Sequence, residues 1–157
     1  MATNAYLYMP NEVVGDVIRS FRVIRVHFDG YLSNMGPILA KNFTDPEKVK
    51  KLFDLGDVSI LAPEITRPVG HTFDNPVSGY TVFYGRDRGE KYCEAGYASA
   101  SEMPGRFNND ILFNTPKIGG TDYIFDGKNW FCYDAGFDMA DDNIGEVNAV
   151  LAATGNI

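Results

Sequence analysis

Residues 17–28, VIRSFRVIRVHF, are the stretch that decides the fold. Alternate residues of an extended chain point to opposite faces, so Phe21 and Val23 fall on one side and Ile24 on the other. Neither side is cleanly polar. The stretch therefore predicts a strand that is covered on both faces, or one with a bulge near Ser20.

Other segments read as strands around this one. A short aromatic run at 4–9 stops at Pro10, and a second strand is expected at 80–84. Residues 123–125 and 130–133 predict a hairpin, because the Asp-Gly pair between them favours a tight turn. Residues 58–61 fit either a turn or a strand. Strands that close by hairpins favour an antiparallel sheet.

Two short helices are predicted before residue 57. Ser33 is expected to cap the first, whose apolar stripe is formed by Met35, Ile38, Leu39 and Phe43. Thr44 and Glu47 have the spacing of a capping box for the second. Pro46 suits an early helical position, and Gly56 marks the end of the helix. The apolar face between them is formed by Val49, Leu52 and Phe53.

Together these elements predict an α+β fold: an antiparallel sheet with two short helices packed on one face and a C-terminal helix carrying Val147 and Leu151. The length suits a single domain over 1–157, with a core at 1–135 and an extension at 136–157. Residues 62–79 are rich in proline and glycine and predict a long loop, which in a compact domain points to function or to local structure.

The composition excludes several classes of partner. A net charge of -7 and a pI near 4.7 argue against binding to duplex nucleic acid or to an anionic membrane. Cys93 and Cys132 do not make a secreted disulfide framework, and the first ten residues do not resemble a signal peptide. We therefore expect a cytoplasmic protein without a membrane span.

The residues with ligand chemistry fall in two clusters. The first lies where a strand gives way to a helix, and the free amides of a helix start can hold an anion. Its candidate ligand-binding residues are His27, Phe28, Asp29, Tyr31, Ser33 and Asn34. The same residue types also form turns and helix caps without any ligand.

The second cluster comprises His71, Asp74, Tyr84, Arg86, Arg88 and Glu90. If the strand at 80–84 continues, Arg86 and Arg88 point the same way and form a fork for phosphate or carboxylate. Aromatic neighbours beside arginines suit a nucleotide, because a base can stack on the rings. The alternative is an exposed turn held by weak surface ion pairs.

Catalytic and metal templates fit less well. The two histidines with Asp29 and Asp74 supply ligands for a divalent metal, but no metal-binding motif or phosphate-binding glycine loop is present. A triad of Ser33, His71 and Asp74 lacks a nucleophile-elbow motif. We expect no metal and no cofactor.

Four elements in this order resemble a family of small proteins encoded by tailed phages and prophages, for which no activity is established: HFDGYLS at 27–33, LGDVS at 55–59, HTFD at 71–74 and FYGRDRGE at 83–90. Relatives tend to have Trp where Phe28 stands. The resemblance implies phage origin and a shared site. It also implies residence in the infected host cell, where small phage proteins often act on host factors.

We therefore expect a non-enzymatic protein that sequesters a nucleotide-like anion, such as a host immune signal. The alternatives are a hydrolase of a nucleotide or glycosidic bond, with His27, Asp29, His71 or Glu90 transferring protons, and an inhibitor that docks on a host protein. Ligand sites are often built where subunits meet, so the aromatic content and the extension favour a homo-oligomer.

Overall fold

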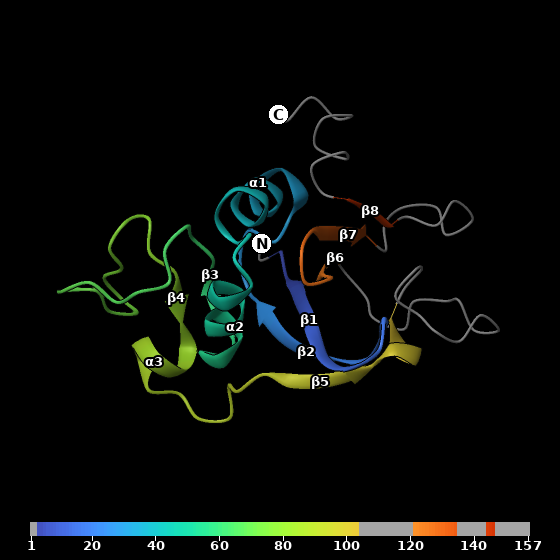
Figure 1. The fold of residues 1–157 in the computed structure, drawn as a ribbon. Coiled ribbons are helices and arrows are strands. Elements are labelled where there is room, and N and C mark those ends of the chain that lie inside the picture. The colour runs from blue at the N-terminus through green and yellow to red at the C-terminus, as the bar shows by residue number, and fades with distance from the viewer. Residues whose placement is uncertain (1–2, 104–120, 135–143, 147–157) are drawn as a thin grey trace.

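The computed structural model describes residues 3–103, 121–134 and 144–146 of the chain. Its strands form one eight-stranded sheet in the order β4-β3-β2-β1-β6-β7-β8, with β5 also paired to β2 (Figure 1). The strands are β1 (Ala5–Val14), β2 (Val17–Val26), β3 (Val58–Ile60), β4 (Val82–Phe83), β5 (Gly96–Ser99), β6 (Thr121–Phe125), β7 (Trp130–Asp134) and β8 (Ile144–Glu146). The helices are α1 (Leu32–Asn42), α2 (Pro46–Asp54) and α3 (Tyr84–Arg88), with a 3-10 turn, η1, at Ala100–Glu102.

The sheet is mixed, so the expectation of an antiparallel sheet was wrong. β1 runs parallel to β6, and β2 runs parallel to β3, while the other pairings are antiparallel. α1 and α2 lie between β2 and β3 along the chain, and such a helical crossover returns the chain in its original direction. Hairpin signals in the sequence do not reveal this connection, because it joins strands that are not consecutive in a hairpin.

β2 organises the sheet, because it pairs with three other strands. β1 pairs with one edge of β2. On the other edge, Ser20–Val23 of β2 pair with β5, and Val26 pairs with β3. The predicted coverage of both faces is confirmed: Ile24 belongs to one buried cluster and Phe21 to another. The predicted bulge near Ser20 is present, because Glu12 pairs with Ser20 and Val13 with Ile18, which leaves Arg19 as an extra residue of β2. A second irregularity lies opposite it in β1, between Pro10 and Glu12.

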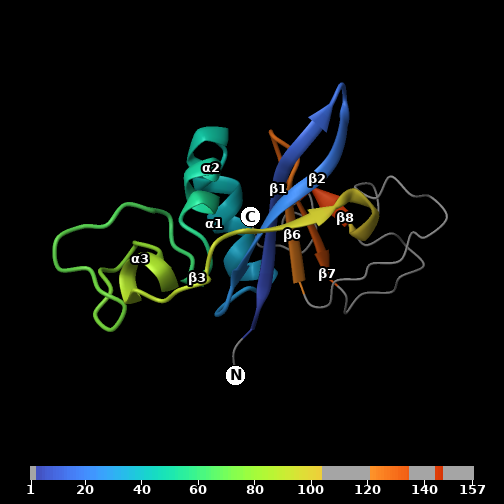
Figure 2. The same ribbon diagram turned by 90° about the horizontal axis from the view of Figure 1, so that it is seen from below.

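The main core lies between the sheet and the first two helices. α1 and α2 lie on the same side of the central strands, and apolar side chains of both helices are fully buried there (Figure 2). They are Met35, Leu39, Val49, Leu52 and Phe53. A smaller cluster on the opposite face contains Tyr8, Phe21, Ala100, Met103 and Ile124. The long loop and α3 lie beyond β3 and β4, away from β6 and β7.

Several local predictions need correction. Tyr31, not Ser33, is the N-cap of α1, and it makes no side-chain capping bond. Asp45, rather than Thr44, caps α2, where its carboxylate accepts a hydrogen bond from the Glu47 amide at 3.0 Å. The first strand does not stop at Pro10 but continues to Val14, because a bulge accommodates the proline.

The strand expected at 80–84 ends at Phe83, and a short helix follows from Tyr84. The predicted hairpin is confirmed by the antiparallel pairing of β6 and β7. The predicted C-terminal helix, including Val147 and Leu151, lies outside the described residues, and 144–146 form β8. Among the helices of the described ranges, none has the length and apolar character that crossing a membrane requires.

Candidate functional site

A cleft of about 250 Å³ opens where the two sequence clusters meet. The end of β2, the turn between α2 and β3, the first residue of α3 and the loop after α3 all contribute to its wall. The lining residues are Arg25, His27, Asp57, Tyr84, Glu90, Lys91, Tyr92 and Cys93. We call this space the His27 cleft.

A hydrogen bond between His27 and Tyr84 joins the clusters. The His27 Nδ1 atom lies 2.5 Å from the Tyr84 hydroxyl, although the two residues are 57 positions apart. The His27 ring also stacks on Phe28, with ring centroids 4.1 Å apart. The His27 amide donates to the Val58 carbonyl at 3.0 Å and so holds the imidazole at the end of the sheet.

Asp57 ties the walls of the cleft together. Its amide donates to the Cys93 carbonyl at 2.8 Å, and its own carbonyl accepts the Tyr84 amide at 3.2 Å. The carboxylate accepts the Arg25 amide at 3.0 Å through Oδ1. Among the described residues, Oδ2 accepts no hydrogen bond, so it is available to a ligand.

Burial and neighbouring carboxylates raise the pKa of two groups in this cleft. Burial raises the pKa of the Asp57 carboxyl, and the charges of Glu90 and Glu94 add to this, outweighing the Arg25 amide and guanidinium. Burial and the same acidic surroundings raise the pKa of the Cys93 thiol. A raised pKa reduces the fraction of the nucleophilic thiolate.

A second cleft, of about 330 Å³, is lined by Thr72, Phe73, Asp74, Asp87 and Arg88. It adjoins the first, because the rings of Phe73 and Tyr84 lie 5.4 Å apart between centroids. The exposed guanidinium of Arg88 lies 4.9 Å from the Phe73 ring centroid. Its Nη1 atom is 4.0 Å from a Glu90 carboxylate oxygen, a weak surface pair.

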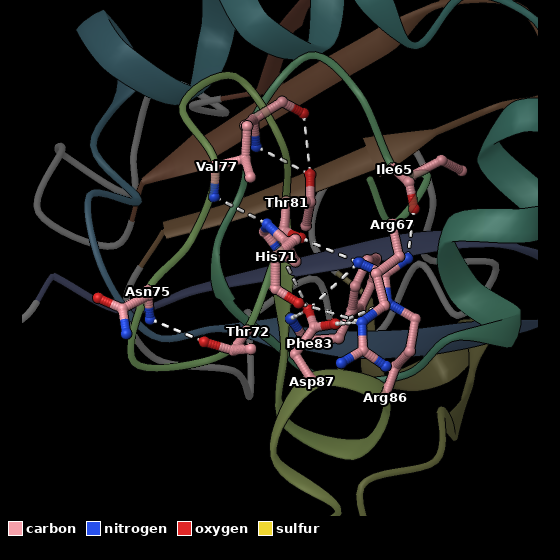
Figure 3. A network of polar contacts seen from close by, with 11 residues as sticks. Ile65, Arg67, His71, Thr72, Asn75, Val77, Thr81, Phe83, Arg86 and Asp87 are labelled. Atoms are coloured by element: carbon pink, nitrogen blue, oxygen red, sulfur yellow. Dashed lines mark hydrogen bonds and ion pairs between the residues drawn. The ribbon is translucent and has the colours of Figure 1, made fainter. Parts of the chain in front are cut away.

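Asp87 is the centre of a buried polar network between the loop and α3 (Figure 3). Its fully buried carboxylate accepts hydrogen bonds from the Phe83 amide at 2.8 Å and from the Arg86 Nε at 2.9 Å. His71 lies 3.3 Å away through Nε2 and accepts the Val77 amide through Nδ1 at 2.9 Å. Because Nδ1 accepts, the ring proton lies on Nε2 and is donated to Asp87.

The predicted fork of Arg86 and Arg88 is not formed. The segment is helical, so a rotation of roughly 200° about the helix axis separates the two residues, and their side chains lie on nearly opposite faces. Arg86 also donates to the carbonyls of Ile65 at 2.6 Å and Thr81 at 3.2 Å, and its side chain is 17% exposed against 57% for Arg88. Arg86 and His71 therefore belong to the network around Asp87, and neither residue lines the two clefts.

The rest of the first cluster forms a turn. Asp29 adopts a φ of 58°, and Asn34 holds it by donating from its amide group to the Asp29 carbonyl at 2.8 Å. Tyr31 and Ser33 are exposed and do not line either cleft. Among the twelve predicted site residues, the His27 cleft includes His27, Tyr84 and Glu90, and the second cleft includes Asp74 and Arg88.

Sequence reasoning missed Arg25, Asp57, Lys91, Tyr92 and Cys93 as residues of the cleft. Asp57 had a usable signal, because it follows the glycine that ends α2. The others carry no local signal, since a loop residue joins a cleft only when distant segments pack beside it.

Comparison of the chain with protein-family models, with curated proteins and with solved structures found no match. Within 3–103, 121–134 and 144–146, no group of three or more His, Cys, Asp or Glu side chains is placed to hold a metal ion.

Proposed function

We propose that the chain binds a small nucleotide-like molecule in the His27 cleft. The observation that carries the proposal is the junction of His27 and Tyr84, which brings distant loops together around an opening lined by rings and by charges of both signs. Clefts with a few convergent polar groups beside aromatic rings are the usual form of small-ligand sites.

The groups of the cleft match the parts of such a molecule. The available Asp57 oxygen suits a hydroxyl of ribose or an amino group of a base. Arg25 and Lys91 supply positive charge for a phosphate, while Asp57 and Glu90 supply an equal negative charge. This balance favours a ligand with few phosphates, because a polyphosphate would meet both carboxylates.

Replacing Asp57 with Asn is expected to weaken binding of such a ligand by about 10- to 150-fold, since a hydrogen bond to a charged group contributes about 1.5–3 kcal/mol. Titration calorimetry with the common nucleoside 5′-monophosphates measures the change. Asp29→Asn is the matched control, because Asp29 lies outside the cleft and Asn tolerates its left-handed backbone. Equal losses in both variants would contradict the assignment.

Binding is also expected to weaken on acidification. A donor of the ligand requires the ionised carboxylate, and the raised pKa of Asp57 means that this form is lost at a higher pH than for an ordinary aspartate. Titrations between about pH 7 and pH 4.5 should show a steeper fall in affinity for the wild type than for Asp57→Asn, because the phosphate of the ligand titrates equally in both. Circular dichroism at each pH checks that the fold persists.

Hydrolysis in the same cleft is the second candidate. Asp57 and Glu90 both line the cleft, and the pKa of Asp57 is raised. Two carboxyl groups in one cleft can transfer protons if Asp57 acts as the acid and Glu90 as the base. His71 and Asp29 no longer belong to this alternative, because neither lines the His27 cleft. Product in excess of protein after incubation indicates hydrolysis, whereas ligand recovered intact indicates binding alone.

The resemblance to phage proteins extends the proposal to the removal of a nucleotide signal in the cytoplasm of an infected cell. Mass spectrometry of small molecules released from protein purified out of infected cells tests this step. A nucleotide recovered with the wild type and depleted with Asp57→Asn supports it. Capture of a host protein in place of any nucleotide favours the interaction inhibitor.

A further inference from the structure

Lys91 and Tyr92 form an exposed tip beside the His27 cleft. Tyr92 is 91% exposed, and its backbone has a φ of 63°, in the left-handed region that residues other than glycine rarely adopt. Within the described part of the chain, the ring makes no hydrogen bond and no contact with another ring. Its position is therefore not explained by packing.

Both ends of the tip are fixed to the walls of the cleft. On one side the Glu90 amide donates to the Tyr84 carbonyl at 3.1 Å. On the other side the Cys93 carbonyl accepts a hydrogen bond from the Asp57 amide at 2.8 Å. The Cys93 carbonyl can approach this closely because Gly56 has no side chain, and a Cβ atom there would lie 2.2 Å from the Cys93 oxygen. Two residues between such anchors have little freedom, and the anchors hold Tyr92 in its unfavourable conformation.

We propose that Tyr92 is the outer wall of the ligand site and stacks on a planar base. The inference rests on the proposed function and narrows the ligand to nucleosides and nucleotides, rather than sugar phosphates or inorganic anions. An aromatic ring held in a strained backbone at a cleft is a feature that functional sites retain although it does not stabilise the fold. Stacking accepts any base, because every base has a flat face.

The experiment compares ligands with and without a base. The four common nucleoside 5′-monophosphates and ribose 5-phosphate are titrated against the wild type and the variants Tyr92→Ala, Tyr92→Gly and Tyr92→Phe. Tyr97→Ala is the control, since Tyr97 is an exposed tyrosine on β5 that does not line the cleft. Thermal unfolding is measured for every variant.

Loss of stacking should weaken binding of the best nucleotide by about 5- to 150-fold in Tyr92→Ala and Tyr92→Gly. Tyr92→Phe and Tyr97→Ala should bind as the wild type does, and the affinity for ribose 5-phosphate should not change. Tyr92→Gly should unfold at the same temperature as the wild type or above it, because glycine adopts a positive φ without steric cost. If the ring instead stabilised the fold, Tyr92→Gly would unfold at a lower temperature than the wild type.

Two results would overturn the inference and leave the proposed function standing. One is unchanged nucleotide affinity in Tyr92→Ala, and the other is an equal loss for ribose 5-phosphate, which would mean that Tyr92 only shapes the cleft. If the wild type binds none of the nucleotides, the proposed function and the inference both fail.

Discussion

Replacing Asp87 with Ala is expected to lower the free energy of unfolding by about 3–5 kcal/mol, the usual effect of removing one partner from a buried charged pair. The change leaves the Arg86 guanidinium without its carboxylate and removes the acceptor for the Phe83 amide and for His71. Urea denaturation at neutral pH measures the loss. A variant as stable as the wild type would contradict the central role of the network.

The same carboxylate predicts a dependence on pH. Burial alone would raise the pKa of Asp87, but hydrogen bonds from Arg86 and the Phe83 amide, with the charge of Arg86, lower it below the ordinary value. Its contribution is therefore present above the unfolded-state pKa, about 4, and is lost as pH falls through the lower folded-state value. Urea denaturation between about pH 5 and pH 2 should show a smaller loss for Asp87→Ala than for the wild type.

Asp74→Ala and Arg88→Ala are the matched controls for this network. Both residues lie in the adjoining cleft but are exposed, and substitutions at such positions usually change stability by less than about 0.5 kcal/mol. Large losses in these controls would show that the whole loop, rather than Asp87 itself, limits stability.

Replacing Gly56 with Ala is expected to lower the free energy of unfolding by about 2–4 kcal/mol, because an unfavourable backbone conformation and a steric overlap act together. Gly56 has a φ of +83°, and a Cβ atom would lie 2.2 Å from the Cys93 carbonyl oxygen. That oxygen belongs to backbone, so relief requires the loop to move and the bond from the Asp57 amide to lengthen. Denaturation gives the stability, and nucleotide titration should show weaker binding.

Gly89→Ala separates the two causes. Gly89 has a φ of +75°, but nothing lies within 4 Å of a Cβ placed there. This variant should lose only about 1 kcal/mol, the conformational part of the effect. If both alanine variants lose the same amount, the close approach of Cys93 does not contribute.

Sequence periodicity was sufficient where neighbouring residues along the chain decide the structure. The apolar face of α2, formed by Val49, Leu52 and Phe53, repeats at the helical spacing and is buried as that spacing predicts. The turn after β6 is likewise local, because the Asp126 carboxylate accepts the amides of Lys128 and Asn129. The mixed apolar character of β2 also revealed that both of its faces are covered.

Tertiary structure alone decided the parallel pairings of the sheet and the site. Parallel pairing of β1 with β6 joins segments far apart in the chain, and the residues of neither strand indicate which strand it pairs with. The direction of Arg86 depends on a helix that begins where the sequence predicted a strand, and on carbonyls of Ile65 and Thr81 that only packing brings near. The cleft likewise required His27, Asp57 and Tyr84 to meet, because hydrogen bonds between distant segments form only after the chain has closed around them.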